Sequence, residues 1–386
     1  MIFSRFKWNA EKILELGEPV KAFIYYRNRR ENLLTGFPET YSINQFTKEL
    51  DAFKLRDKVT LPRVYHFYYE FGFLEAGLSH LIQEETPLAV MIEYKKSKKV
   101  SLPKTKMSHL PLKTLERPNW SEYREAFGKI QEELLDGNCY QVNLTYPFDF
   151  ETEDVIDPRD LADYFFSKPH LGAFAHSTYL GEEMILSNSP ECLFQYNKGE
   201  IFTMPIKGTM KRGESWREQW KEMKSSLKEE GELFMITDLL KNDLNRLSFG
   251  KARVRKLKAP LLVPHLLHQY SLISAKLSPE ISVGETMRSL FPGGSITGAP
   301  KKRVMEIISK TERYNRGIYC GSTLLCYEDK KMASINIRTA SIALGERIWR
   351  YGAGGGVTLL SRPVDEFKEM ESKVVSFLTL LKVPGY

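Results

Sequence analysis

Three charged side chains recur at helical spacing near the end of the chain. Glu366, Glu369 and Lys373 fall three and four residues apart within 363–381, a stretch whose apolar residues follow the period of an α-helix. The three side chains therefore form a strip beside the apolar face. Two carboxylates so close together repel each other unless a cation lies between them. The same spacing also fits a plain surface ion pair between Glu369 and Lys373, worth only about 0.2–0.5 kcal/mol.

A third glutamate, Glu232, lies at the start of another predicted helix, 232–247. It falls within the arc of that helix's apolar residues rather than opposite them, although an acidic residue at a helix start is also explained by the helix dipole. A hard cation such as Mg²⁺ prefers carboxylate and water oxygens. One Mg²⁺ ion would account for all three glutamates together.

Lys207 follows a predicted strand, 200–206, and precedes Gly208. A lysine in such a place is most often solvated. To act as a nucleophile it needs surroundings that lower its pKa from about 10.4, by removing it from water or by placing a cation beside it. Glu191 precedes it by 16 residues and could exchange protons with a reacting group, or it could be an ordinary turn carboxylate.

Two glycine-rich segments offer backbone N–H groups to an anion. In Phe291–Pro300 a glycine-rich loop runs into a predicted helix, and Ala353–Gly356 lets a ligand approach the backbone closely. Either segment could be only a tight turn. Arg338 is expected on the polar face of a strand, 332–343, where it could bind a carboxylate through two nitrogens or form a surface ion pair.

The elements that must hold these residues are predicted in runs of strands rather than in strict alternation with helices. This pattern favours an α+β protein, with a large, mainly antiparallel β-sandwich core flanked by helices. The expected strands include 172–180, 183–187, 192–196, 268–277, 318–327 and 347–353. A lysine- and proline-rich stretch near residue 110 predicts a shortened N-terminal subdomain, 1–110, and a catalytic region, 111–386, within one compact unit.

Composition narrows the class of protein. The 386 residues are 42% hydrophobic, which is ample for a core, and they include neither an apolar leader nor a run long enough to cross a bilayer. Four scattered cysteines without a C-x-x-C pair argue against structural zinc and fit a cytoplasmic protein. The net charge of +7 is densest in the lysines of 95–106, which are predicted to be a solvated linker and not a nucleic-acid surface.

Several stretches, in this order along about 260 residues, resemble the chorismate-utilising enzymes, which include the anthranilate, aminodeoxychorismate, isochorismate and salicylate synthases. The matching stretches are GNCYQVNLT from 137, SNSPE from 187, PIKGTMKRG from 205, ELFMITDLLKND from 232, FPGGSITGAPK from 291, INIRT from 335, AGGG from 353 and EFKEMESK from 366. The resemblance implies a fold like that of anthranilate synthase component I.

The resemblance also implies roles for individual residues. It implies Mg²⁺ held by Glu232 and Glu369, with Glu366 close by, while Lys207 attacks the substrate and Glu191 acts as the general acid. The residues that it places around chorismate are Thr209, His268, Ser295, Tyr319, Arg338, Gly354, Gly356 and Lys373.

Two positions indicate which chemistry within the family to expect. Lys207 in PIKGT resembles the aminodeoxychorismate synthases, component I, whereas anthranilate synthases usually carry alanine there. Gln141 stands where the isochorismate and salicylate enzymes carry a water-activating lysine, so water addition is disfavoured.

The expected reaction is therefore Mg²⁺-dependent amination of chorismate at C4, giving 4-amino-4-deoxychorismate for 4-aminobenzoate and folate synthesis. No nucleophile elbow of a glutaminase is visible, so ammonia is expected from a separate glutamine amidotransferase subunit. Two alternatives stay open. One is anthranilate synthase component I, and the other is an inactive chorismate-binding scaffold.

Overall fold

The computed structural model describes residues 1–211, 213, 215–225, 227–263 and 266–386, without the side chains at 209, 211, 224, 225, 227–230, 263 and 266. Every strand pairing within these ranges is antiparallel, and neighbouring strands follow one another in a continuous order. That order is β7 (Leu112–Glu116), β8 (Gln141–Thr152), β20 (Ile348–Val357), β19 (Thr339–Ala343), β10 (Glu183–Ser187), β9 (His176–Tyr179), β1 (Phe3–Lys7), β2 (Lys12–Tyr25), β6 (Ala89–Ser101), β5 (Val59–Phe67), β17 (Ser322–Glu328), β18 (Lys330–Ile335), β11 (Cys192–Asn197), β12 (Glu200–Met204), β15 (Leu266–Lys276) and β14 (Arg253–Val263). The predicted fold class, a mainly antiparallel sheet with flanking helices, is confirmed.

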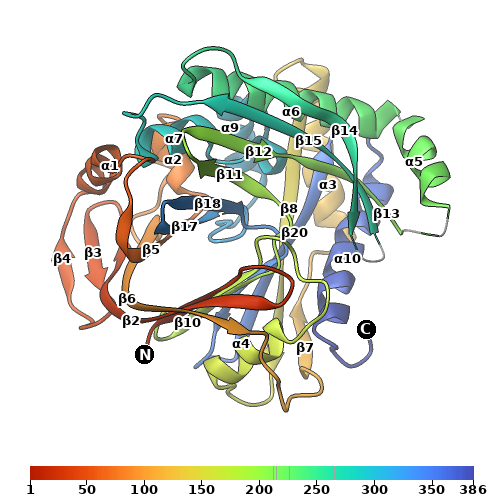
Figure 1. Ribbon diagram of the computed structural model, residues 1–386. Helices are drawn as coiled ribbons and strands as arrows, with labels where there is room; N and C mark the ends of the chain where they lie inside the picture. Colours follow the sequence, from red (N-terminus) through yellow and green to blue (C-terminus); the bar gives the residue numbers. More distant parts are fainter. Residues whose placement is uncertain (212, 214, 226, 264–265) are drawn as a thin grey trace.

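Short strands and helices complete the described fold. β13 (Ile206–Lys211) also pairs with β15, β16 (Gly298–Ala299) pairs with β8, and β3 (Arg29–Asn32) and β4 (Pro38–Thr40) extend from β2. The helices are α1 (Ile43–Ala52), α2 (Phe71–Glu75), α3 (Trp120–Leu135), α4 (Pro158–Phe166), α5 (Trp216–Ser225), α6 (Leu227–Leu247), α7 (Val283–Leu290), α8 (Gly294–Thr297), α9 (Lys301–Thr311) and α10 (Pro363–Leu380), with one 3₁₀ turn at Ser79–Leu81. Figure 1 shows α6, α7 and α9 gathered above the sheet, and α3 and α10 beside β8 and β20.

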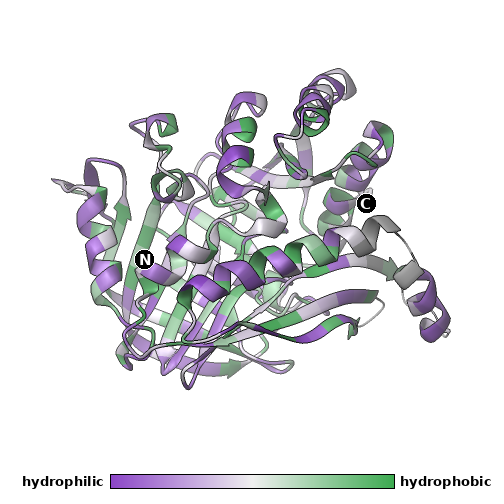
Figure 2. Ribbon diagram, turned by 90° about the horizontal axis from the view of Figure 1, so that it is seen from above, coloured by the Kyte–Doolittle hydropathy of each residue, from purple (hydrophilic) through white to green (hydrophobic). Residues whose placement is uncertain are grey.

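The larger of two hydrophobic core clusters lies between the sheet and these helices. Large aromatic side chains such as Trp349, Tyr351, Tyr123 and Phe127 are fully buried there. In Figure 2 the peripheral helices carry hydrophilic and hydrophobic residues in alternation, as expected of helices with one face against a core. Among the described residues, no helix is long and apolar enough to cross a membrane.

Two sequence-based expectations about local structure are wrong. The strand predicted at 332–343 is two strands, β18 and β19, because the backbone turns at Arg338, whose φ is +52°. Arg338 therefore lies in a connection and not on a strand face. The lysines at 95–99 belong to β6, where they pair with β2, and are not part of a linker.

The boundary at residue 110 stays a prediction. Strands from both sides of it share the sheet, since β5 pairs with β17 and β1 pairs with β9.

Helix α6 begins at Leu227 and runs through Gly231, so Glu232 lies in its second turn rather than at its start. The helix-dipole explanation for Glu232 is weakened accordingly, because the dipole acts mainly in the first turn.

Candidate active site

Lys207 and Glu232 form a half-buried ion pair. Nζ of Lys207 lies 3.2 Å from Oε2 of Glu232, and the two side chains are 16% and 12% exposed. Gly208 follows the lysine with a φ of +69°, and the register between β13 and β15 shifts at this residue. A positive φ favours glycine, so Gly208 allows the irregularity that follows the lysine.

The charges around Lys207 change what was expected of it. Burial lowers the pKa of Lys207, but the carboxylates of Glu232, Glu191 and Glu369 outweigh burial and raise it above its ordinary value. The sequence-based requirement of a lowered pKa is therefore not met by these surroundings. A nucleophilic role needs a change at the site that reduces the pull of these carboxylates on the ammonium group.

Glu191 is a buried carboxyl between positive groups. It is 4% exposed. Burial raises its pKa to about 7, against the opposing effects of Ser295, Lys207, the backbone of Ile206, and Arg338. A carboxyl that titrates near neutral pH can both donate and accept a proton there.

Arg338 is held beside Glu191 by the backbone. The carbonyl of Arg338 accepts a hydrogen bond from the N–H of Asn188 at 2.9 Å, and the carbonyl of Glu191 accepts one from Ile335 at 3.0 Å. The connection between β18 and β19 therefore runs alongside the turn that carries Glu191. His268, in β15, is also near, since burial and the guanidinium of Arg338 lower its pKa.

Helix α10 brings its carboxylates to the same region. Glu366 is buried and accepts a hydrogen bond from Oγ of Ser361 at 2.7 Å. Glu369 is half exposed and pairs with Lys373 at 2.9 Å, and Lys373 donates to the carbonyl of Gly354 at 2.7 Å. The predicted i, i+4 pair is thus present, and its lysine also binds the glycine-rich strand.

The glycine-rich strand passes close to β8. Gly354 lies opposite Thr145 and Gly356 opposite Asn143. A Cβ at Gly354 would overlap the carbonyl of Leu144, and one at Gly356 would overlap the amide of Gln141. At position 354 only glycine therefore permits the approach to the backbone of β8. Ser295 lies nearby in α8, is buried, and acts on the pKa of Glu191.

One predicted site residue lies apart from this group, and the side chain of another is not described. The side chain of Thr209 lies outside the described part of the chain. Tyr319 precedes β17, its ring lies against Gly352, and it lines a cavity of about 230 Å³ together with Arg316 and Glu183.

The carboxylates match the kind of ligand that Mg²⁺ takes, although they are not arranged around a common point. Glu232 and Glu369 both act on the same ammonium group, that of Lys207. Glu366 and Glu369 both act on the pKa of Tyr123. Among the described residues no three His, Cys, Asp or Glu side chains are arranged so that they could hold a metal ion as they stand. The carboxylates of Glu232, Glu366 and Glu369 offer only oxygen atoms and carry at least two negative charges together. Mg²⁺ prefers ligands of this kind.

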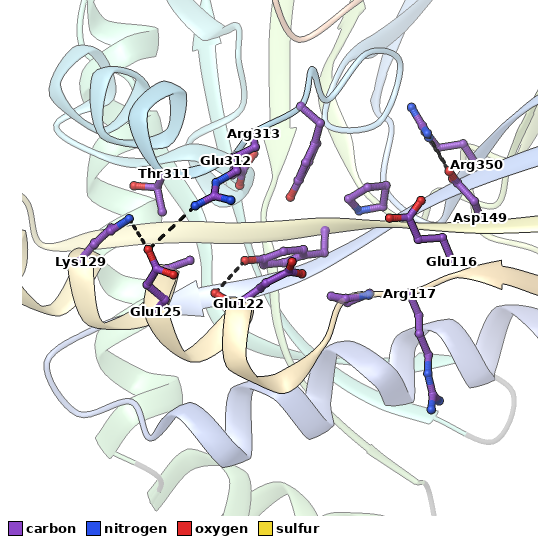
Figure 3. A pocket seen from close by; sticks show the side chains of 15 residues that line it. Glu116, Arg117, Glu122, Glu125, Lys129, Asp149, Thr311, Glu312, Arg313 and Arg350 are labelled. Atoms are coloured by element: carbon purple, nitrogen blue, oxygen red, sulfur yellow. Dashed lines mark hydrogen bonds and ion pairs between the residues drawn. The ribbon is translucent and has the colours of Figure 1, made fainter.

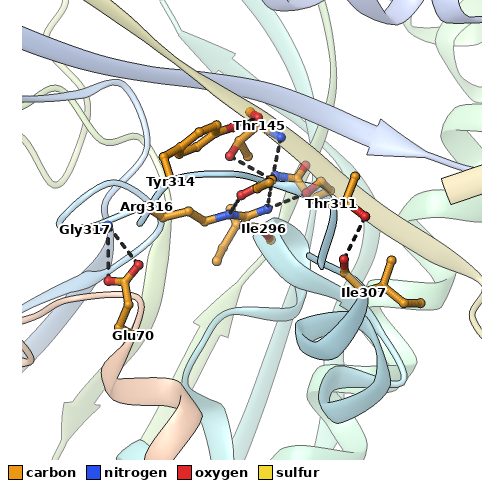
Figure 4. A network of polar contacts seen from close by, with 10 residues as sticks. Glu70, Thr145, Ile296, Ile307, Thr311, Tyr314, Arg316 and Gly317 are labelled. Carbon is orange, nitrogen blue, oxygen red and sulfur yellow. Dashed lines mark hydrogen bonds and ion pairs between the residues drawn. The ribbon is translucent and has the colours of Figure 1, made fainter. Parts of the chain in front are cut away.

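A buried network that was missed from the sequence supports the site. Arg316 donates to Glu312 at 2.8 and 2.7 Å, to the carbonyl of Ile296 at 2.8 Å and to that of Asn143 at 2.6 Å (Figure 4). Its side chain is 1% exposed. The network thus joins Ile296, which follows Ser295, to Asn143, which lies opposite Gly356. In the sequence, the spacing of four residues between Glu312 and Arg316 could have indicated this ion pair.

Glu70 accepts hydrogen bonds from the N–H of Gly317, the residue after Arg316, at 3.2–3.3 Å (Figure 4). Burial raises its pKa to about 7. Because this value exceeds the ordinary 4.5, the carboxyl stays protonated in the folded protein after it has ionised in the unfolded chain. Its stabilising effect is therefore complete below about pH 4.5 and is lost as the pH rises through about 7.

Between pH 5 and pH 8 we expect the free energy of unfolding to fall less in Glu70→Gln than in the wild type. The difference between the two falls should reach up to about 3 kcal/mol. Urea denaturation at several pH values measures this difference. Glu84→Gln, at an exposed position, is the control and should follow the wild type. Equal slopes for Glu70→Gln and the wild type would show that the Glu70 carboxyl titrates normally.

Two cavities in the described part of the chain lie apart from the charged group around Lys207. One of about 280 Å³ lies between α3 and β8 and is lined by charged side chains that include Glu122, Glu125 and Arg313 (Figure 3). Most of these side chains are exposed, and Glu125 already pairs with Lys129 at 2.7 Å. The Lys207 group is the stronger candidate, because buried opposite charges and a carboxyl that titrates near neutral pH converge there.

Comparisons with known proteins point to one family. A family model described as chorismate binding enzyme matches residues 43–379. Aminodeoxychorismate synthase component 1 of Salmonella typhimurium is 36% identical over 258 residues, which cover 66% of this chain and 56% of that protein. The protein of the same name from Escherichia coli is 35% identical over 268 residues, with 68% and 58% covered. The chain thus spans little more than half the length of these relatives.

More distant matches share the fold. Anthranilate synthase component I from Streptococcus pneumoniae superposes with a TM-score of 0.78 at 19% identity, covering 96% of this chain and 93% of that one. The menaquinone-specific isochorismate synthase of Escherichia coli gives a TM-score of 0.71 at 14% identity, covering 99% and 89%. At these identities the likeness concerns the fold alone.

Proposed function

The chain belongs to the family of chorismate-binding enzymes, and from this premise we propose that it aminates chorismate at C4, as component I of an aminodeoxychorismate synthase. The observation that carries the proposal is the half-buried Lys207, paired with Glu232 and acted on by Glu191. The relatives named aminodeoxychorismate synthase component 1, at 35–36% identity, support the same reaction.

In the proposed mechanism the ε-amine of Lys207 attacks C2 of chorismate. Both ring double bonds shift, from C1=C2 to C1=C6 and from C5=C6 to C4=C5, the C4–O bond breaks, and Glu191 donates the proton with which the hydroxyl leaves as water. Ammonia then adds at C4 and returns a proton to Glu191, both double bonds shift back, and the bond between C2 and the lysine nitrogen breaks. A carboxyl with a pKa of about 7 suits the acid role, since it still holds its proton in part at neutral pH.

The remaining residues would bind and orient the substrate. Arg338, with its planar fork of donors, suits the ring carboxylate, and the backbone at Gly354 and Gly356 together with Lys373 suits the enolpyruvyl carboxylate. His268 and Ser295 would line the ring. Mg²⁺ held by Glu232 and Glu369, with Glu366 nearby, would polarise the substrate carboxylate and would neutralise the charge that now raises the pKa of Lys207.

We further propose that a separate glutamine amidotransferase supplies the ammonia. The name "component 1" of the relatives implies a partner component in those proteins. Anthranilate synthase is the second candidate, because Anthranilate synthase component 1 3 of Haloarcula marismortui is 30% identical over 262 residues. Lys207 favours amination at C4 over anthranilate synthesis, because anthranilate synthases usually carry alanine at this position.

The test is to incubate the chain with chorismate, Mg²⁺ and an ammonium salt, and to identify the product by mass spectrometry. Amination at C4 predicts a product that keeps the enolpyruvyl group. Loss of pyruvate with formation of anthranilate would transfer the assignment to the second candidate. Absence of any product would favour an inactive chorismate-binding scaffold.

Glu369→Gln should raise the Mg²⁺ concentration needed for half-maximal turnover by about tenfold or more, because a neutral amide is a weaker ligand than a carboxylate. The fold should survive, since the side chain is 53% exposed. Glu371→Gln on the same helix removes an equal charge and is the control. An unchanged Mg²⁺ requirement in Glu369→Gln would refute the ligand assignment.

A further inference from the structure

Gln269 is a buried polar residue that the proposed mechanism does not use. It lies in β15, it is fully buried, and neither its amide nitrogen nor its amide oxygen has a hydrogen-bond partner among the described residues. Burying an amide without partners costs free energy, so most buried amides are hydrogen-bonded. Such an exception calls for a specific explanation.

The register of the sheet places this amide beside Lys207. Gln269 lies directly opposite Lys207 in the antiparallel pair of β15 and β13. Directly opposed residues project from the same face of a sheet, with Cβ atoms about 4.5–5.5 Å apart. Lys207 and Gln269 are therefore neighbours on one face.

Helix α6 covers that same face. Ser271, two residues from Gln269 and hence on its side of the strand, accepts a hydrogen bond from Thr237 of α6 at 2.9 Å. Glu232, the partner of Lys207, is on the same helix. The unpartnered amide thus lies in the layer between sheet and helix that holds the reactive lysine. Gln141, which lies against Gly356, is a second buried amide without a partner among the described residues.

The chemistry of the amide indicates what it would recognise. An amide carries no charge, and it presents donors and an acceptor side by side. A carboxylate offers only acceptors and is better bound by Arg338 or Lys373. A hydroxyl group both donates and accepts, and it matches the amide in full. The substrate of the proposed reaction has a single hydroxyl, the one at C4.

Resting on the proposed function, we propose that Gln269 contacts the C4 hydroxyl of the substrate, with Nε2 donating to the oxygen that departs. This hydrogen bond strengthens as the C4–O bond breaks ahead of the proton transfer from Glu191 and negative charge develops on the oxygen. Its loss should therefore lower kcat more than it raises KM. It would also make Gln269 a determinant of specificity for a substrate with a hydroxyl at that carbon.

The experiment compares Gln269→Met with the wild type in steady-state turnover of chorismate and in thermal unfolding. Methionine has a similar length and no hydrogen-bonding amide. We expect kcat to fall about 10- to 100-fold with little change in KM, and the Tm to stay equal or rise. Ser271→Ala, which removes a hydrogen bond to α6 from the same face, is the matched control. It should lower the Tm and leave kcat within about threefold.

Wild-type kcat in Gln269→Met, or a lower Tm with unchanged kinetics, overturns the inference and leaves the proposed function standing. A wild-type protein that does not convert chorismate overturns both. Should Gln269→Met fail to fold, Gln269→Asn keeps the amide but withdraws it by one methylene group. It should show the same fall in kcat, and an unchanged kcat in that variant overturns the inference.

Discussion

Lys207→Ala should lower the rate of chorismate amination by at least about 10³-fold, because it removes the group that forms the covalent intermediate. The lysine is held between β13 and α6 by its ion pair with Glu232, at 3.2 Å. The residual product should shift toward anthranilate, since alanine stands at this position in the anthranilate synthases that the sequence resembles. Product analysis by mass and single-turnover rates measure both effects.

Lys276→Ala provides the matched control, because Lys276 is an exposed lysine of β15 and its loss changes the net charge equally. It should leave the rate unchanged. Circular dichroism should show both variants folded. Full amination activity in Lys207→Ala would mean that the lysine only neutralises Glu232, and that ammonia reacts without covalent catalysis.

Arg316→Leu should destabilise the protein by about 3–5 kcal/mol, the cost of leaving one partner of a buried ion pair without the other. Glu312 is 2% exposed and also accepts hydrogen bonds from the N–H and hydroxyl of Thr145. Without Arg316, the carbonyls of Ile296 and Asn143 lose their partner as well. Because these residues flank Ser295 and face Gly356, turnover should fall together with stability. Urea denaturation measures the loss.

The neighbouring Arg313→Leu is the control for this prediction. Its side chain is 81% exposed and lies 4.0 Å from Glu125, so its loss should cost less than about 1 kcal/mol. The double variant Arg316→Met, Glu312→Leu should recover part of the stability lost in Arg316→Leu, because it leaves no unpaired buried charge. A loss below about 1 kcal/mol in Arg316→Leu would contradict the role assigned to the network.

Periodic patterns in the sequence were sufficient to predict α10 and much of the sheet. The helix predicted at 363–381 is observed at Pro363–Leu380, and the strand predicted at 183–187 is observed with the same bounds. The helix shows as apolar residues at spacings of three and four, and the strand as the short apolar run 184–186.

Features that depend on distant residues could not be predicted in this way. The turn at Arg338 is stabilised by a backbone contact with Asn188, which lies 150 residues earlier. The raised pKa of Lys207 depends on carboxylates from three separate elements. The orphan amide of Gln269 becomes apparent only once β13 pairs with β15 and α6 covers both. In each case local propensity carries no information about the partner.

The most direct test of the account is the intact mass of the wild-type protein after incubation with chorismate and Mg²⁺ in the absence of ammonia. The account predicts a covalent adduct with the mass of chorismate less one water, located by peptide mapping on the segment that contains Lys207 and absent from Lys207→Ala. An unmodified protein that nevertheless aminates chorismate once ammonia is added would contradict it.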